Sequence, residues 1–288
     1  MIPIVVCADD FGHSSGTSLA ILWLLQRRAI NATSCMVGGQ AWPAMAPALR
    51  HAADADPRLA VGLHLNFTER LAQAGEGPRT GSQPAGLAAL LAPPRRSNQG
   101  LIADSIAGQW DAFVTAFGRE PDFVDGHHHA HLAPGVQAAL VAFLARIQFA
   151  GWVRQCRTSS ARPGTKRLAL DQLSDQFRQR GERQGLTFNT GFGGLRGFRQ
   201  DENLEALWRT DLAAMRRGGV LMVHPGDDSA SRSGDSIGSH RRREAGLLAQ
   251  GVIPRILNDL GCRLDRWPAV RQQASTAHCQ TRTTSPPG

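Results

Sequence analysis

Lysine is almost absent from this chain: Lys166 is the only one, so nearly all of the positive charge is arginine. The formal net charge of the 288 residues is +8, which brings nucleic-acid binding into consideration. A nucleic-acid groove combines a clustered basic stripe with stacking aromatic side chains. The short arginine runs here are scattered, without interleaved aromatic residues, at 95–96, 216–217 and 241–243. The pattern favours an arginine-biased surface and no nucleic-acid partner.

Cysteine is also scarce, and its five residues form an odd set without a CxxC spacing. This argues against a disulfide framework and against a thiolate zinc site, and it fits a reduced, cytoplasmic setting. No apolar stretch has the length that spans a membrane. The apolar segment 2–8 is too short for a signal-peptide core and has no basic leader. We therefore expect a cytoplasmic protein without a membrane span.

Internal repeats and a convincing linker are missing too, which predicts one catalytic domain over residues 1–268. Residues 75–100 are rich in Gly, Pro, Ser and Arg and predict a long loop or lid, and 227–239 predict a second polar loop. The polar tail 269–288 ends in Ser-Pro-Pro-Gly, and we expect it to be disordered. A composition of 42% hydrophobic and 19% charged residues suits a folded core.

What the chain does have is a series of short apolar runs, which predict buried strands. The predicted strands are 2–8, 31–37, 59–66, 122–125 and 219–225, and the predicted helices are 16–28, 42–53 and 135–149. Strands that alternate with helices are typical of parallel βαβ units. In such folds the catalytic groups lie where strands end and loops begin.

Four of the predicted strand ends carry polar groups suited to chemistry: Asp9 with Asp10, His64, the histidines within 127–131, and His224. Two imidazoles and one carboxylate can bind a divalent cation and leave positions for water and substrate. The two aspartates point in different directions because side chains alternate along a strand. One of them can bind a metal while its neighbour faces the substrate as a base.

Each of these features also has a purely structural explanation. One aspartate of the pair could cap the following helix, and His64 or His224 could be a hydrogen-bonded core histidine. The cluster 127–131 could be a surface loop, although four histidines in five residues are costly to fold unless they are exposed or coordinated. The coincidence of four such strand ends favours a functional site. His13 has no comparable context, although it is close enough to line a pocket.

The pattern resembles the YdjC/ChbG family of carbohydrate deacetylases, hopanoid-associated relatives included. The resemblance covers about residues 2–265 and rests on four motifs: Ala8-Asp9-Asp10-Phe11-Gly12, Gly62-Leu63-His64-Leu65, Asp125-Gly126-His127-His128-His129-Ala130-His131 and Val223-His224-Pro225-Gly226. It implies an α/β fold, a distorted TIM-barrel-like (β/α) barrel with parallel strands and the active site at their C-terminal ends. His13 stands where an apolar residue is common in the family.

The resemblance also implies roles for individual residues. A divalent metal cation, Mg or Zn, would be held by Asp10, His64 and His127. Asp9 would be the general base and His224 the general acid. Five further residues would bind substrate or support the metal ligands: His129, His131, Asn66, Phe11 and Arg196.

The implied activity is hydrolysis of the N-acetyl group of an acetylated amino sugar, chito-oligosaccharide-like or related, with release of acetate. A bound cation lowers the pKa of its water from about 15.7 toward about 7 and polarises the acetyl carbonyl. Asp9 takes the proton, and His224 protonates the departing amine.

Other functions stay open on the sequence alone. The same ligands could serve another metal-dependent amidohydrolase or a phosphoesterase on a non-sugar substrate. Phosphate chemistry benefits from a second metal or an arginine clamp, and the sequence has no second carboxylate-rich ligand set. A non-enzymatic sugar-binding or nucleic-acid-binding protein is the third reading, and a homodimer is one option for the assembly.

Overall fold

The computed structural model describes residues 1–39, 41–69, 96–160, 165–227 and 237–267. The elements run in the order β1 (Ile2–Phe11), α1 (Ser15–Gln26), β2 (Ala32–Cys35), α2 (Ala41–Ala55), β3 (Ala60–Leu65), α4 (Arg96–Phe117), β4 (Phe123–Gly126), η1 (His127–Leu132), α5 (Pro134–Arg146), β5 (Trp152–Val153), α6 (Thr165–Glu182), β6 (Thr187–Phe188), β7 (Phe192–Gly193), α7 (Leu204–Ala214), β8 (Gly219–Val223), α8 (Gly238–Ala249), α9 (Val252–Asp259) and β9 (Cys262–Leu264).

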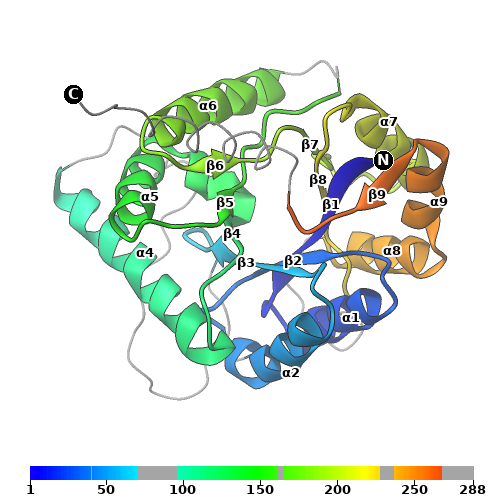
Figure 1. Ribbon diagram of the computed structural model, residues 1–288, viewed down its shortest axis with the longest axis horizontal. Helices are drawn as coiled ribbons and strands as arrows, with labels where there is room; N and C mark the ends of the chain where they lie inside the picture. The colour runs from blue at the N-terminus through cyan, green and yellow to red at the C-terminus, as the bar shows by residue number, and fades with distance from the viewer. Residues whose placement is uncertain (40, 70–95, 161–164, 228–236, 268–288) are drawn as a thin grey trace, which may run out of the picture.

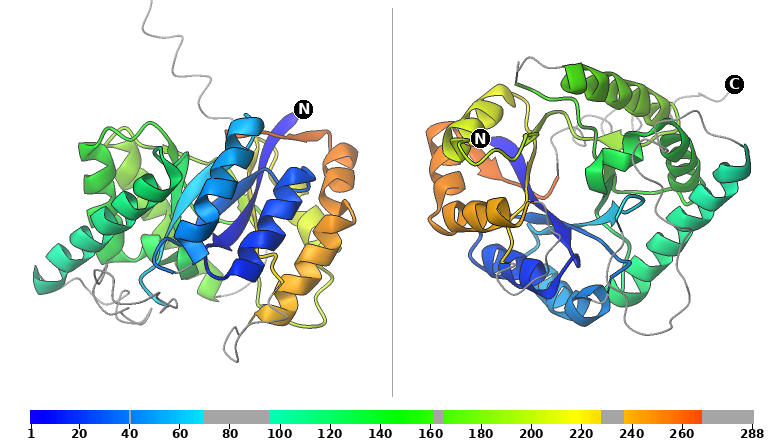
Figure 2. Two further views of the ribbon diagram at one scale, coloured as in Figure 1. Left: turned by 90° about the horizontal axis from the view of Figure 1, so that it is seen from below. Right: turned by 180° about the vertical axis from the view of Figure 1, so that it is seen from behind.

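The strands form one curled sheet with the helices around its outside (Figure 1; Figure 2). The strand order is β6-β5-β4-β3-β2-β1-β8-β7, with β9 paired to β1. Every strand pairing among the described residues is parallel. An isolated parallel bridge joins Thr158, which follows β5, to Phe192 of β7. The expected distorted barrel of parallel strands is therefore confirmed.

Strand β1 lies at the centre of this sheet, between β2 and β8. Its residues from Ile4 onward are fully or almost fully buried, as expected for an apolar run covered on both faces. The strand runs on to Phe11, beyond the predicted end at residue 8, so Asp9 and Asp10 belong to it. The register with β2 shifts between Ala8 and Phe11, which marks a bulge at the two aspartates.

The turn from β1 into α1 is capped by Ser14, whose Oγ accepts the backbone N–H of Thr17 at 3.0 Å. The suggestion that an aspartate of the pair caps this helix is therefore wrong. Gly12 has a φ of +87°, and a Cβ there would come within 2.4 Å of the Met36 carbonyl oxygen. Glycine at position 12 avoids both this clash and the strain of a positive φ.

The predicted strands and helices are all present, with ends shifted by a few residues. The sequence missed the shortest strands (β5, β6, β7 and β9) and helices α4 and α6 to α9. The predicted loop 75–100 is wrong in its last part, because α4 begins at Arg96, and residues 75–95 lie outside the described residues. The loop 227–239 likewise overlaps the start of α8, and the tail 269–288 is outside the described residues.

None of the helices among the described residues combines the length and the apolar character that a membrane crossing requires.

Candidate metal centre

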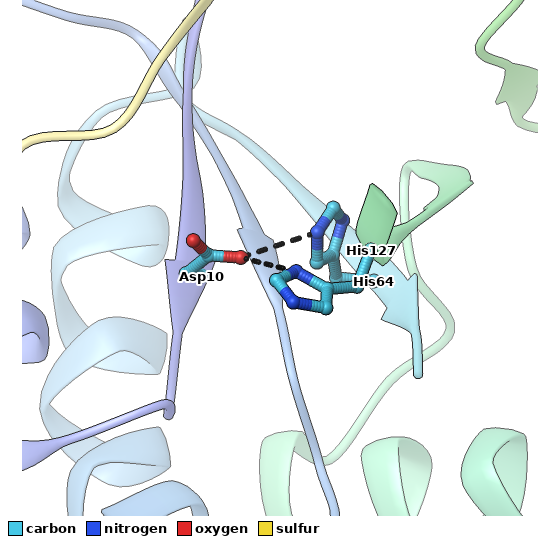
Figure 3. A group of neighbouring side chains, drawn as sticks. All are labelled: Asp10, His64 and His127. Carbon is cyan, nitrogen blue, oxygen red and sulfur yellow. Dashed lines mark hydrogen bonds and ion pairs between the residues drawn. The ribbon is translucent and has the colours of Figure 1, made fainter. Parts of the chain in front are cut away.

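Asp10 on β1, His64 on β3 and His127 at the start of η1 converge at the carboxyl ends of their strands (Figure 3). Oδ1 of Asp10 lies 3.3 Å from Nε2 of His64 and 3.1 Å from Nδ1 of His127. All three side chains are buried, and one ligand atom from each lies within 4.8 Å of the others. The sequence predicted this set, and the fold brings it together.

Asp10 is held so that its two oxygens have separate tasks. Its backbone φ is +71°, a left-handed conformation that is strained for a residue with a Cβ and that concentrates at functional sites. The Arg241 guanidinium lies 2.8 Å from Oδ2, which leaves Oδ1 to the two imidazoles. Burial raises the pKa of Asp10, but Arg241 and His127 outweigh burial and lower the pKa well below its usual value. Asp10 is therefore an anionic ligand.

His64 is fixed by a carboxylate behind it. Its Nδ1 lies 2.6 Å from Oδ1 of Asp125 on β4, and the Ser34 hydroxyl donates to the same oxygen. Burial lowers the pKa of His64, but the nearby carboxylates, Asp125 foremost, outweigh burial and raise the pKa to about 10. A metal-ligating histidine commonly has a carboxylate on its second nitrogen, which orients the ring. The geometry of His64 fits that role, with Nε2 facing Asp10.

His127 has the same arrangement with its ring nitrogens exchanged. Its Nδ1 faces Asp10, and its Nε2 lies 2.9 Å from Oε2 of Glu69, a residue that the sequence reasoning missed. Burial lowers the pKa of His127, but Asp10 and Glu69 outweigh burial and raise the pKa. Each of the two ligand imidazoles thus lies between Asp10 and a second carboxylate, which is Asp125 for His64 and Glu69 for His127.

The histidine-rich segment spreads its side chains because His128 and His129 both adopt left-handed conformations, with φ of 52° and 55°. His128 is exposed and lies 2.9 Å from the Thr68 hydroxyl through Nδ1. His127 and His131 are buried, so the alternative of an exposed adventitious loop is wrong for them.

His129 and His131 have hydrogen-bond partners other than His127, and their predicted contact with substrate stays a prediction. Nδ1 of His129 is 3.5 Å from the Cys156 thiol, and Nε2 of His131 is 3.0 Å from the Arg154 carbonyl oxygen. Burial lowers the pKa of His131 to about 4, so this imidazole is neutral near pH 7. The side chain beside His127 Nε2 is that of Glu69.

Asp9 points away from Asp10 and makes a two-point ion pair with Arg154, at 2.6 and 2.8 Å. The same guanidinium lies 2.7 Å from Oδ2 of Asp125. Cys7, Asp9 and Asp125 also have the spacing of metal ligands. Because the Arg154 guanidinium already contacts both carboxylates, it supplies the positive charge there, and Asp10, His64 and His127 remain the better cation site.

His224 lies just after β8 and is partly buried. Its backbone N–H donates to Oε2 of Glu244 at 2.6 Å, and its ring packs edge to face against Phe198 at 5.3 Å. Burial lowers the pKa of His224, while Asp10 and Asp9 lie near enough to oppose that shift. Arg196 lies 3.4 Å from Oε1 of Glu244 and so supports the residue that holds the His224 backbone.

Two predicted site residues have structural tasks in the fold. Phe11 has no exposed surface and packs edge to face on Trp42 in the core. Asn66 uses its side-chain amide inside a turn, where Oδ1 accepts the backbone N–H groups of Thr68 and Glu69 and Nδ2 donates to the Glu69 carbonyl oxygen. Asn66 therefore builds the turn that carries Glu69.

Four important residues were missed or misjudged. Arg241 belongs to a run that was interpreted as surface arginine, but it is 2% exposed and binds Asp10. Asp125 precedes the histidine run, and the sequence pattern assigned it no role. Glu69 and Arg154 stand in no recognisable motif. His64 and Asp125 are direct partners across β3 and β4. The signal available for Asp125 was therefore its place on the strand that pairs with the strand of His64.

A divalent cation fits the donor set found here. Asp10 Oδ1, His64 Nε2 and His127 Nδ1 face one another, and the second nitrogen of each imidazole contacts a carboxylate. Carboxylate oxygen and imidazole nitrogen are accepted by zinc and by other divalent metals. With three protein ligands, such a site keeps coordination positions for water and substrate.

Comparisons with known proteins find similar sequences over nearly the whole chain. A family model described as YdjC-like protein matches residues 3–259. A chitooligosaccharide deacetylase from Enterobacter sp. (strain 638) is 30% identical over 187 residues, 60% of this chain and 70% of that protein. A chitooligosaccharide deacetylase from Klebsiella pneumoniae (strain 342) is 27% identical over 272 residues, 93% of this chain and 98% of that protein.

Among solved structures, a protein from Enterococcus faecalis V583, named for a proposed role in cellobiose-phosphate cleavage, superimposes with a TM-score of 0.67. The alignment covers 91% of this chain and 96% of that protein, at 16% sequence identity. A likeness at this identity establishes the shared fold.

Proposed function

The chain belongs to the YdjC-like protein family, and on that premise we propose that it is a metal-dependent carbohydrate deacetylase. It hydrolyses the N-acetyl group of an acetylated amino sugar, of the chito-oligosaccharide kind or a related glycoside, and releases acetate. The observation that carries the proposal is the convergence of Asp10, His64 and His127 at the strand ends, with Asp9 beside Asp10 in sequence and His224 close by. The names of the two deacetylase relatives support the sugar.

The cation, Mg or Zn, would be held by Asp10 Oδ1, His64 Nε2 and His127 Nδ1. When bound, it polarises a carbonyl oxygen and makes water a better nucleophile near neutral pH. Arg241 keeps Asp10 anionic and directs Oδ1 toward the imidazoles. Asp125 and Glu69 stand behind the two rings and neutralise their charge when the rings are protonated.

Asp9 is proposed as the base that accepts a proton from the attacking water. Arg154 holds both of its oxygens and fixes the plane of the carboxylate. A carboxylate has about four acceptor positions on its two oxygens. Arg154 occupies one on each oxygen and the Cys7 thiol a second one on Oδ1, so Asp9 can still accept from a water molecule at Oδ2.

His224 is proposed as the acid that protonates the departing sugar amine. Its ring is set by two features: Glu244 binds its backbone N–H, and Phe198 packs on its side. Burial lowers the pKa of His224, and Asp10 and Asp9 oppose that shift. A histidine that gains and loses a proton near neutrality suits this exchange.

The phosphoesterase alternative is disfavoured by the contacts of Arg154. Two-metal phosphoesterases use a second cation beside the first. The second carboxylate-rich group of the described residues, which contains Asp9 and Asp125, is in contact with the Arg154 guanidinium. Single-metal hydrolysis of an amide agrees better with this arrangement.

The test is acetate release from a panel of N-acetylated sugars, including diacetylchitobiose. The protein is stripped with a chelator and then given Mg, Zn, Mn or Co, with a phosphate-ester substrate in parallel. We expect acetate release that stops on chelation and returns with metal. A protein that binds metal yet releases no acetate across the panel would refute the proposed substrate class. A cytoplasmic location and a homodimer stay predictions.

A further inference from the structure

Glu69 connects two histidines that are distant in the sequence. Its Oε1 lies 3.0 Å from Nε2 of His13, and its Oε2 lies 2.9 Å from Nε2 of His127. The side chain is 36% exposed, so it is only partly shielded from solvent. His127 and His13 hold the pKa of Glu69 below its usual value, so the residue is a carboxylate near neutral pH. It therefore presents one acceptor oxygen to each ring.

The turn that carries Glu69 is built to hold it in this place. The Asn66 side chain accepts the Glu69 backbone N–H at 3.0 Å and donates to the Glu69 carbonyl oxygen at 2.8 Å. Asn66 is itself anchored to α4, because Gln109 accepts its backbone N–H and donates to its carbonyl oxygen. One residue earlier, the Thr68 hydroxyl contacts His128. The segment after β3 is thus fastened at several points to the histidine-rich segment and to α4.

The contact with His127 mirrors the one behind His64. In each case one ring nitrogen faces Asp10 Oδ1 and the other faces a carboxylate, which is Asp125 for His64 and Glu69 for His127. The partner of the second nitrogen decides which nitrogen of an imidazole is free to bind a metal. The Glu69 contact is less well aligned: the distance is short, but the N–H of Nε2 does not point directly at the carboxylate, so the contact is an ion pair.

We propose that Glu69 is a positioning residue of the metal centre: its carboxylate holds Nε2 of His127 and so keeps Nδ1 of that ring on the Asp10 side. This inference rests on the metal centre of the proposed function. It adds a residue that acts through His127, and it gives His13 a task as the second partner of the Glu69 carboxylate. Exchange of the roles of the two nitrogens would move the metal-binding lone pair away from Asp10.

The experiment compares full-length variants for zinc affinity, measured by competition with a chromophoric chelator. Glu69→Leu removes both acceptor oxygens at similar size and should weaken zinc binding about 10- to 100-fold, the usual effect of losing such a partner. Glu69→Gln keeps one acceptor oxygen without the charge and should recover part of that loss. His13→Leu leaves the contact with His127 intact and should cost less than Glu69→Leu. Glu182→Gln, an exposed glutamate that is paired with Arg178 in α6, is the control and should match the wild type.

A second readout separates positioning from general damage. NMR of the ring nitrogens in zinc-loaded, ¹⁵N-histidine-labelled protein reports which nitrogen of His127 carries the metal. We expect Nδ1 in the wild type and a mixture or loss of the signal in Glu69→Leu, with an unchanged thermal melting curve. Wild-type affinity and Nδ1 ligation in Glu69→Leu would overturn this inference and leave the deacetylase proposal intact. If the wild type binds no divalent cation, the metal-centre proposal itself fails, and the inference falls with it.

Discussion

The two ligand imidazoles of the candidate centre have similar partners in different surroundings. The carboxylate behind His64 is Asp125, which is fully buried on β4 and also contacts Arg154 and Ser34. The carboxylate behind His127 is Glu69, which lies in a turn after β3 and is 36% exposed. The first half of the site is therefore part of the folded sheet, whereas the second half depends on a surface turn.

This difference predicts what each half contributes. Removal of a buried carboxylate that is shared by a histidine and an arginine breaks two buried charge contacts, so Asp125 is tied to the stability of the fold. A partly exposed ion pair contributes little to folding, because water and ions screen it. Glu69 should therefore matter for metal binding and very little for stability. The predictions below test this contrast in order of expected effect.

The largest effect is expected for Asp10→Ala, because Asp10 Oδ1 serves both halves. The variant should lose zinc binding in a chelator-competition assay and lose acetate release down to background. His127→Ala removes only the ligand imidazole beside Glu69, and it should also lose zinc binding and acetate release. Retention of metal-dependent activity in either variant would show that the cation binds elsewhere.

The second prediction concerns Asp9, which belongs to neither ligand pair. Asp9→Asn should keep the zinc affinity of the wild type within a few-fold, because Asp9 faces Arg154 and not the imidazoles. Turnover should fall about 10²- to 10⁴-fold, the range for loss of a general base. Full activity of Asp9→Asn would make the assignment of the base wrong.

The third prediction compares the two carboxylates directly by urea denaturation of the metal-free protein. Asp125→Ala should lower the free energy of unfolding by about 3–5 kcal/mol, because it breaks a buried ion pair with Arg154 and leaves His64 without its partner. Glu69→Ala should change it by less than about 1 kcal/mol. Equal losses of unfolding free energy in the two variants would contradict the contrast between Asp125 in the sheet and Glu69 in the turn.

The sequence was informative about this site where strands are long and apolar. Asp10, His64 and His224 follow or end such runs, so their strand ends could be predicted and their meeting followed from parallel topology. The family resemblance supplied the choice among the histidines of 127–131. The fold class was predicted from the same alternation of strands and helices, and it is confirmed by the strand pairings.

The partners behind the ligands were out of reach for a physical reason. Arg154 follows β5, a strand of two residues that leaves no apolar run to detect. Glu69 lies in a turn whose geometry depends on Asn66 and on Gln109 of α4, contacts made between segments about 40 residues apart. Arg241 was hidden in a run of arginines, because burial of one member of a charged run depends on packing against a distant aspartate.

The fourth prediction uses the metal to measure the site as a whole. A ligand that binds only the folded state stabilises it by about 2.7 kcal/mol at a concentration 100-fold above its Kd. Zinc at that excess should raise the melting temperature of the wild type, and a chelator should reverse the rise. Asp10→Ala should show no such shift, since its site lacks the shared carboxylate. A shift of the same size in Asp10→Ala would place the stabilising metal at another site.

The smallest effect is expected for Asn66→Ala, which touches the centre only through the turn. The substitution removes the side-chain hydrogen bonds that hold Glu69, while the Glu69 carboxylate itself stays in the chain. A net hydrogen bond is worth about 0.5–1.5 kcal/mol, so zinc affinity should fall only a few-fold, less than in Glu69→Leu. In the double variant Asn66→Ala with Glu69→Leu, the loss should equal that of Glu69→Leu alone, because the turn acts through the carboxylate. Additive losses would mean that Asn66 supports the centre by a route independent of Glu69.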